Sequence, residues 1–312
     1  MKTKIAILSG GSSFEREISL QSSKIVIKYL QKKNYDIKNI ELPNSKENTK
    51  WIDELLKFSP NIVLNLLHGG DGENGSVSGL LKCLNIKSIG NNVLSGAICM
   101  NKNICKSVLK DKGVPVCEDV FISLNDNVLD FEEKIKELGF PVIVKPNNGG
   151  GSIGISVCTN ISEVKLAIKN IFETYKDSVI IEKFITGKEV TCVVVKKNNN
   201  LKVFPILDIL TNNKFYDYEA KYIDSKTKVD FSTLPEFIQK MIEDISKKVF
   251  NIFECSGVCC VDLIVSEEQV YFIEVNTIPG FTSNSTVTRT LKKLNIDVCE
   301  FIEELIQDKL NE

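Results

Sequence analysis

The stretch CVDLIVSEEQVYFIEVN, residues 260–276, decides the fold, because two apolar runs separated by a short polar segment predict a β-hairpin. Positions two apart on a strand share a face, so Glu274 and Asn276 project together. A three-residue turn at 267–269 places Asp262 directly opposite Glu274, whereas a two-residue turn puts the two carboxylates out of register. We therefore expect two carboxylates and one carboxamide on one face of a sheet.

These oxygen ligands suit Mg²⁺, which takes one or two carboxylates and completes its shell with water and substrate phosphates. A polar strand end that meets solvent is the competing interpretation, and for Asp262 and Glu274 taken alone both stay open. The stretch continues through a Pro279-Gly280 turn into hydroxyl and amide side chains at 282–285. The rest of the chain has to decide between the two interpretations.

Composition limits the class of protein. The 312 residues favour two or three subdomains. The formal net charge of −2 argues against nucleic acid or a membrane surface as a partner bound through bulk charge. We recognise no signal peptide and no apolar run of membrane length, and we expect a cytoplasmic protein. The ten cysteines are scattered, several inside apolar runs (Cys83, Cys99, Cys192), and we expect them to be reduced and mostly buried.

The first third of the chain predicts a parallel sheet, because strands and helices alternate in a βαβαβ pattern. A glycine-rich turn at 9–13 follows the first strand, and a glycine-dense loop at 68–75 follows the third. Ligands in open α/β sheets bind at this edge, although a plain turn remains an alternative for the second loop. The expected strands cover 4–8, 35–40 and 61–67, and the expected helices cover 14–30 and 51–58.

Glu15 has two open interpretations at this stage. It lies at the start of the first helix, where a strand, a glycine turn and a helix N-terminus form a site for an anion or ligand. The spacing from Ser12 also fits a capping box, S-x-x-E, in which Glu15 has a purely structural role.

A second glycine loop lies in the middle of the chain. The strand at 141–146 contains Lys145, and the loop at 147–154 has four glycines before a partner strand at 155–158. No Gly-Lys-Ser/Thr opens a helix, so this is not a Walker A loop. A flexible hairpin whose backbone N–H groups close on a phosphate is favoured over a plain glycine turn.

The remaining elements complete a mixed chain. A segment at about 212–233 has the composition of a long ordered loop, the kind usually kept for function. Further strands are expected at 178–185 and 187–195, and helices at 95–112, 130–138, 162–175, 235–253 and 298–310.

In this order the motifs resemble those of D-alanine–D-alanine ligases, members of the ATP-grasp superfamily, over essentially the whole chain. FYDYEAKY at 215–222 is the most specific match, since eight consecutive residues agree with the active-site Ω-loop of that family. Each of the other matching motifs is moderate alone. They are GGSSFEREIS at 10–19, LHG at 67–69 with Gly72-Glu73, VIVKP at 142–146 and EVNTIPGFTSNS at 274–285.

The resemblance implies an α/β (α+β) chain with the ATP-grasp fold. A Rossmann-like, parallel-sheet domain would cover 1–94, and two α+β ATP-grasp subdomains would cover 95–185 and 186–312, with ATP between their antiparallel sheets. It also implies the reaction: the first D-alanine attacks the γ-phosphate to give an acyl phosphate, and the amine of the second displaces phosphate. The implied cofactors are ATP and two Mg²⁺ (or Mn²⁺), the substrate is D-alanine or a related amino acid, and the assembly is a homodimer.

The resemblance assigns cofactor residues as well. Asp262, Glu274 and Asn276 would hold the metal ions. Lys102, Lys145 and Ser152 would contact the ATP phosphates; Glu182, Phe184 and Ile185 would line the adenine hinge; and Glu189 would bind the ribose.

The substrate residues follow in the same way. Glu15 would receive the ammonium of the first substrate, with His68 beside it, and Ser285 and the Gly280 backbone would hold the carboxylate of the second. Lys221 would reach the γ-phosphate, and Tyr222 would close the Ω-loop over the site and exclude water.

The sequence departs from the family at four positions near this chemistry. The family carries an arginine two residues before the aspartate at 262, and here that residue is Cys260. Gly151 replaces a serine, Thr286 replaces an apolar residue, and Asn74 replaces an aspartate. Besides a D-alanine–D-alanine ligase, a sister ligase with a changed substrate and an ATP-binding pseudoligase therefore remain alternatives.

We predict that Cys260→Arg raises turnover, measured as ADP release. Strand alternation places Cys260 on the face of Asp262, where a guanidinium would stabilise the acyl phosphate and the tetrahedral oxyanion. The absence of one such contact typically lowers a rate by about 10²–10³. An unchanged or lower rate would show that this site stabilises charge in another way.

Overall fold

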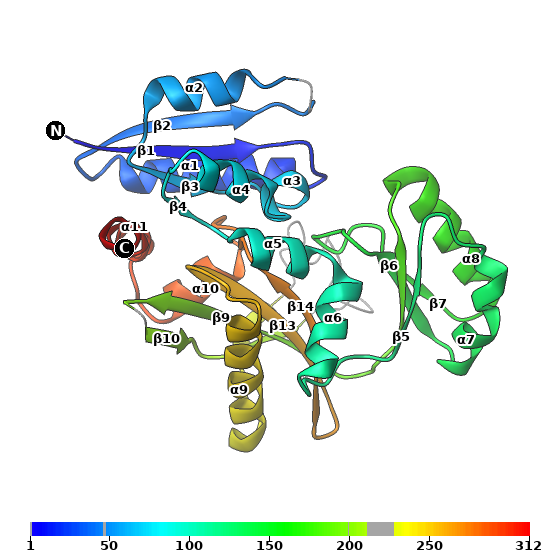
Figure 1. The fold of residues 1–312 in the computed structure, drawn as a ribbon. Helices are drawn as coiled ribbons and strands as arrows, with labels where there is room; N and C mark the ends of the chain where they lie inside the picture. The colour runs from blue at the N-terminus through cyan, green and yellow to red at the C-terminus, as the bar shows by residue number, and fades with distance from the viewer. Residues whose placement is uncertain (1, 46–47, 199, 211–227) are drawn as a thin grey trace.

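Three β-sheets organise the protein (Figure 1). The structure is a computed structural model, and it describes residues 2–45, 48–198, 200–210 and 228–312. Figure 1 shows the N-terminal sheet above the C-terminal sheet, with the central sheet to one side. The mixed α/β (α+β) class expected from the sequence is confirmed.

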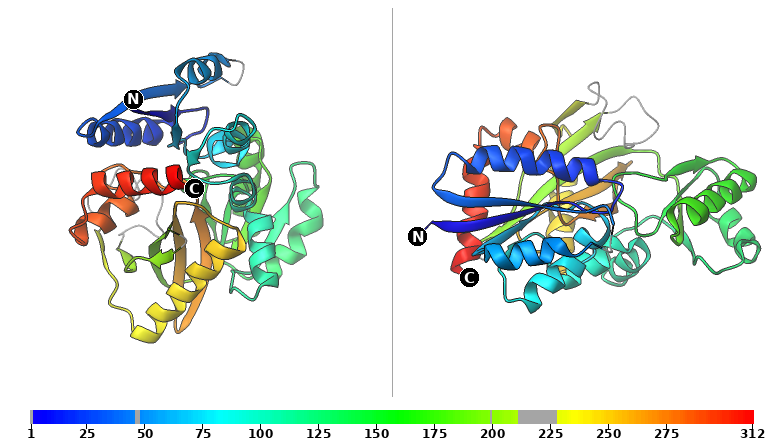
Figure 2. Two further views of the ribbon diagram at one scale, coloured as in Figure 1. Left: turned by 60° about the vertical axis from the view of Figure 1, so that its left-hand side comes forward. Right: turned by 90° about the horizontal axis from the view of Figure 1, so that it is seen from above.

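The N-terminal sheet is parallel throughout, as predicted, with the strand order β2-β1-β3-β4. In β1 (Thr3–Gly10) six consecutive residues are buried, which is typical of a parallel strand covered on both faces. Figure 2 (right) shows α1 (Arg16–Leu30) on one side of this sheet and α2 (Lys50–Phe58) on the other. The remaining elements are β2 (Tyr35–Leu42), β3 (Ile62–Asn65), α3 (Gly70–Glu73), α4 (Ser76–Cys83) and β4 (Ser88–Ile89).

The central sheet is antiparallel and has the strand order β5-β8-β6-β7. Its edge strand β5 (Asp119–Ile122) has only four residues and was not predicted from the sequence. The other elements are α7 (Glu132–Glu137), β6 (Val142–Pro146), β7 (Ser156–Cys158), α8 (Ile161–Asn170) and β8 (Val179–Lys183).

The C-terminal sheet holds the longest strands, in the order β12-β11-β9-β13-β14, with β10 beside β9. The segment 286–293, which we had not predicted to be helical, forms α10 (Thr286–Lys293). The other elements are β9 (Lys188–Lys197), β10 (Asn200–Val203), β11 (Leu207–Leu210), β12 (Lys228–Phe231), α9 (Glu236–Ile252), β13 (Val258–Ser266), β14 (Gln269–Asn276) and α11 (Val298–Asn311).

The hairpin of β13 and β14 corrects one prediction and confirms another. Ser266 pairs with Gln269, so the turn has two residues and the predicted three-residue turn is wrong. The pairing of Asp262 with Glu274 is nevertheless confirmed, because the register shifts between Asp262 and Leu263. This β-bulge leaves Ile273 as the extra residue and restores the register that the short turn would lose.

The helical stretch expected at 95–112 is two helices, α5 (Val93–Met100) and α6 (Lys102–Asp111). Asn101 separates them and caps α6, accepting a hydrogen bond from the Ile104 N–H at 3.0 Å. Both helices contribute to the same buried cluster as β9, β13, β14 and α9, so they pack on the C-terminal sheet. The division of the chain at 94/95 and 185/186 stays a prediction.

A second buried cluster joins the N-terminal and C-terminal sheets. It combines residues of β1, β3 and α1 with residues of β9, β13, α10 and α11. The helix α11 packs against α1 and β4, and Figure 2 (left) shows it directly beside the N-terminal sheet. The loops at the carboxyl ends of β1 and β3 are thereby held near the end of β14.

The cysteine prediction holds with one correction. All ten cysteines are free thiols and nine are buried, but Cys83, expected inside an apolar run, is exposed near the end of α4. Within the described ranges, no helix is long and apolar enough to cross a membrane.

Candidate active site

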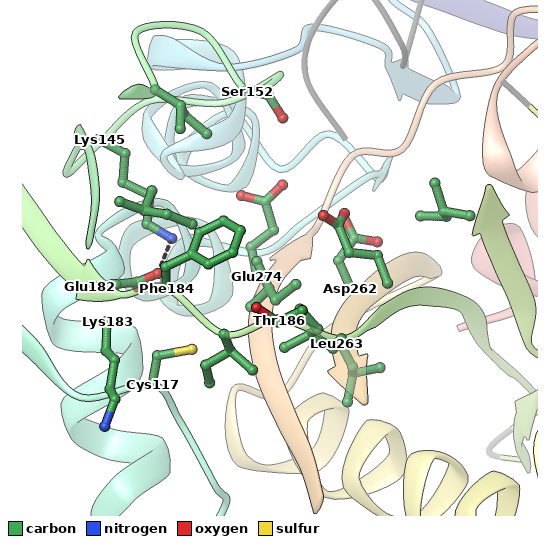
Figure 3. Close-up of a pocket in the computed structure, with 18 of the residues that line it drawn as sticks. Cys117, Lys145, Ser152, Glu182, Lys183, Phe184, Thr186, Asp262, Leu263 and Glu274 are labelled. Atoms are coloured by element: carbon green, nitrogen blue, oxygen red, sulfur yellow. Dashed lines mark ion pairs between the residues drawn. The ribbon is translucent and has the colours of Figure 1, made fainter. Parts of the chain in front are cut away.

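A cleft lies between the central and C-terminal sheets. Figure 3 shows Lys145 and Glu182, from β6 and β8, on one side, and Asp262 and Glu274, from β13 and β14, on the other. Of the residues predicted for the cofactors, the cleft is lined by Lys145, Ser152, Glu182, Phe184, Ile185, Glu189, Asp262 and Glu274.

Asp262 is positioned by its neighbours in the sheet. Its Oδ1 accepts a hydrogen bond from Thr191 Oγ1 at 2.6 Å, and its Oδ2 accepts one from Asn276 Nδ2 at 3.2 Å. Glu274 lies opposite Asp262 in the register, and its Oε2 is 3.8 Å from Lys102 Nζ. Sequence reasoning missed Thr191, whose only signal is that it is the one hydroxyl side chain in the buried run 190–195 of β9.

This donor set fits a hard divalent cation. Two carboxylates and a carboxamide stand on neighbouring strands, and all three residues are half-buried. A 180° turn of the Asn276 amide would present its oxygen instead of its nitrogen. Over the described ranges, no three His, Cys, Asp or Glu side chains gather as metal ligands by themselves. An ion here would therefore take the rest of its shell from water and phosphate oxygens, as Mg²⁺ does.

Glu182 lies between two buried lysines. Its Oε2 is 2.7 Å from Lys145 Nζ, and its Oε1 is 2.8 Å from Lys106 Nζ. Burial alone would raise the pKa of Glu182, but the two ammonium groups outweigh it and lower the pKa to about 2. Glu182 is therefore ionised, and its carboxylate is turned toward the lysines. Sequence reasoning missed Lys106, although it lies four residues after Lys102 on the predicted helix.

Lys102 does not line the cleft but contacts the glycine loop, since its Nζ donates to the Gly149 carbonyl. The next glycines lie against Glu15. A Cβ on Gly151, which has a φ of +60°, would lie 2.8 Å from Glu15 Oε1. A serine at this position would be strained here, which gives a physical reason for this departure from the family.

A second pocket gathers Glu15, His68, Gly280 and Ser285 from among the residues predicted to bind substrate. Asp262 lines both this pocket and the cleft, so the two spaces adjoin at this residue. Cys260 also lines it, opposite Asn276, which confirms that Cys260 lies on the face of Asp262. The lining includes Glu15, His68, Glu73, Cys260, Asp262, Asn276, Gly280, Ser285 and Thr286.

His68 is neutral and fixed in orientation. Its Nδ1 lies 2.8 Å from the Ile278 carbonyl, which can only accept, so Nδ1 carries the proton. Its Nε2 is then an acceptor, 3.4 Å from Ser22 Oγ. Burial lowers the pKa of His68 to about 4. The imidazole therefore forms a wall of the pocket and holds the loop after β14.

The capping-box interpretation of Glu15 is wrong. The helix α1 begins at Arg16, and Glu15 is itself the N-cap residue, without a side-chain cap hydrogen bond. Ser13 instead donates its hydroxyl to the His68 carbonyl at 2.5 Å. The Glu15 carboxylate faces the glycine loop and the second pocket.

Two further features of the pocket were missed. Glu73 is buried and accepts N–H groups from Gly69, Thr277 and Ile278 at 3.0–3.2 Å, which ties the His68 loop to the loop after β14. Burial raises the pKa of Glu73, although these hydrogen bonds partly oppose the rise. Glu73 had two signals in the sequence, its place in the glycine-dense loop and the matching pair Gly72-Glu73, but it was given no role. The other feature is α10, whose N-cap Ser285 lines the pocket.

Asn74, one of the departures from the family, lies away from both pockets. Its side chain bonds Asp71 and the backbone of Ser76 within a local turn. Lys221, Tyr222 and the motif at 215–222 lie outside the described residues.

Two antiparallel sheets that enclose a cleft beneath a glycine loop define an enzyme of the ATP-grasp class. A family model described as "D-ala D-ala ligase C-terminus" matches residues 108–307. The chain is 36% identical, over 98% of both chains, to the D-alanine–D-alanine ligase of Clostridium beijerinckii. It is 34% identical to D-alanine–D-alanine ligase B of Clostridium perfringens, over 99% of this chain and 98% of that protein. The chain belongs to the D-alanine–D-alanine ligase family.

Solved structures agree with this assignment. The D-alanine–D-alanine ligase of Bacillus anthracis complexed with ATP superposes with a TM-score of 0.85, at 30% identity, over 99% of this chain and 98% of that one. The VanG D-Ala:D-Ser ligase of Enterococcus faecalis superposes with a TM-score of 0.83, at 26% identity, over 99% of this chain and 100% of that one.

We predict that His68→Asn changes the pH dependence of stability. Between pH 6.5 and 4 the unfolded chain protonates this histidine and the native chain does not, so wild type loses about 3 kcal/mol of unfolding free energy through it as the pH falls. Asparagine keeps a donor to Ile278 without titrating. Urea unfolding at pH 7, 5.5 and 4.5 should show the stability difference moving in favour of the variant. A difference that is constant with pH would contradict the neutral buried imidazole.

Proposed function

We propose that this protein is an ATP-dependent ligase that joins two D-alanines and releases ADP and phosphate. The observation that carries the proposal is the meeting of the cleft and the second pocket at Asp262. A nucleotide in the cleft and an amino acid in the pocket would have their reacting groups side by side there, and such positioning supplies much of the rate in phosphoryl transfer.

The cleft supplies contacts for each part of ATP. Phe184 and Ile185 offer apolar surface for the base, and Glu189, which also lines the cleft, would bind the ribose. Lys145 and Ser152 lie nearer the glycine loop, where they would contact the phosphates. The ATP complex of the similar Bacillus anthracis ligase supports the use of ATP.

The second pocket suits two amino acids. The Glu15 carboxylate would receive the ammonium of the first substrate, beside the neutral His68. The N-terminus of α10, with Ser285 as its N-cap, and the Gly280 backbone would hold the carboxylate of the second substrate. Lys221 and Tyr222 remain assigned by resemblance alone, to the γ-phosphate and to closure over the site.

We propose that Asp262, Glu274 and Asn276 hold Mg²⁺, where it would neutralise charge on the transferred phosphoryl group. The charges of the side chains that line the second pocket also favour a bound cation. Its lining contains the carboxylates of Glu15, Glu73 and Asp262, and the described residues that line it include no lysine or arginine. Cys260 supplies none in place of the family's arginine.

The setting that we propose rests on family membership alone. It is the synthesis of the D-alanyl-D-alanine unit of peptidoglycan precursors, in the cytoplasm, by a homodimer.

The reaction is tested by ADP and phosphate release from purified protein across a panel of D- and L-amino acids that includes D-alanine and D-serine. We expect release that depends on D-alanine, with D-alanyl-D-alanine as the product. Turnover only with another amino acid would point to the sister ligase, and ATP binding without turnover would point to the pseudoligase.

The metal site is tested separately from turnover by the binding of Mn²⁺ in the presence of ADP, followed by electron paramagnetic resonance. Asp262→Asn should weaken Mn²⁺ binding by roughly tenfold or more, because it removes one of two carboxylate ligands. Asp230→Asn, which removes an exposed carboxylate from the same sheet, is the matched control and should change nothing. Equal Mn²⁺ affinity in both variants would place the ion elsewhere.

A further inference from the structure

Four charged side chains meet between α6 and the central sheet. Lys106 Nζ lies 2.8 Å from Glu182 Oε1 and 2.9 Å from Asp119 Oδ1, while Glu182 Oε2 lies 2.7 Å from Lys145 Nζ. Lys106, Lys145 and Glu182 are each at most 4% exposed. The group is therefore a continuous, largely buried chain of ion pairs.

The sheet register explains why these groups meet. Asp119 on β5 is directly opposite Glu182 on β8, and Glu182 is opposite Ile143 on β6. Lys145 lies two residues after Ile143 and so shares its face. Asp119, Glu182 and Lys145 thus lie on one face, and α6 crosses that face with Lys106.

The members of the chain of ion pairs differ in their access to the cleft. Lys145 and Glu182 line it, whereas Lys106 does not. The formal charges of the two lysines, Glu182 and Asp119 sum to zero. Without Lys106 the group would be negative, next to the proposed position of the ATP phosphates. Among the described residues, Lys145 would then be the only cation within ion-pair distance of Glu182.

We propose that Lys106 is a positioning residue for the nucleotide. By sharing Glu182, it leaves the Lys145 ammonium available to a phosphate oxygen and offsets the buried negative charge beneath the cleft. This inference rests on the proposed nucleotide site. It concerns binding and not the joining of amino acids.

A purely structural role for Lys106 makes a different prediction. In that case the ion pairs only hold α6 against the central sheet. The loss of Lys106 would then lower the stability of the protein and weaken the binding of ATP and of adenosine by the same factor. A positioning role acts mainly through Lys145, so it should weaken the binding of ATP far more than that of adenosine, whose base would lie near Glu182. The comparison of ATP with adenosine therefore separates the two roles.

The experiment is isothermal titration of wild type and Lys106→Met with ATP and with adenosine, in the absence of amino acids. ATP affinity should fall roughly tenfold to a hundredfold, which is the effect expected from disturbing one charged hydrogen bond. Adenosine affinity should fall much less than ATP affinity, and Lys106→Arg should restore most of the ATP affinity. Lys110→Met removes an exposed charge from the same helix and should have no effect.

Equal losses for ATP and adenosine, or no loss for ATP, would overturn the proposal. If Lys106→Met does not fold, Asp119→Asn provides a second test, because the Asp119 side chain is 22% exposed. Without the charge of Asp119, Lys106 would pair with Glu182 alone, so ATP affinity should stay the same or rise. A weaker ATP affinity would contradict the inference. Since no turnover is measured, a failed ligase assay leaves the result interpretable.

Discussion

The site depends on the pairing of Asp262 with Glu274 across β13 and β14. A slip of one residue would turn one of the two carboxylates to the opposite face of the sheet. The two-residue turn alone would produce that slip, and the bulge at Ile273 prevents it. Thr191 then holds Asp262 from the neighbouring strand at 2.6 Å. The cleft and the second pocket share this one positioned carboxylate.

Buried polar contacts fix the walls of the second pocket. Glu73, His68 and Ser22 belong to the N-terminal part of the chain, yet each bonds the loop after β14, which lies 204 to 259 residues further along the chain. Ser22 Oγ accepts the Phe281 N–H at 3.2 Å and lies beside the Nε2 of His68. Because these groups are satisfied within the protein, the two walls are held together without a ligand. The pocket is thus formed in advance for a small substrate.

Local patterns in the sequence predicted the parallel sheet, the two glycine loops and the facing pair Asp262 and Glu274. The bulge at Ile273 could not be predicted, because one extra residue within an apolar run leaves no pattern of its own. The helix α10, TVTRTLKK, is rich in β-branched threonines, and it forms because Val287 and Leu291, one turn apart, are buried. Lys106 was missed because its carboxylate partners lie on strands that are distant in sequence.

The central claim is that a substrate carboxylate and the terminal phosphate of ATP meet at Asp262. The most direct test uses D-alanine labelled with ¹⁸O in its carboxylate and follows the label in the released phosphate by mass spectrometry. Transfer through an acyl phosphate predicts phosphate that carries a single ¹⁸O, with the other oxygen kept in the peptide bond. Unlabelled phosphate formed together with dipeptide would contradict the account, because the carboxylate would then not have attacked ATP.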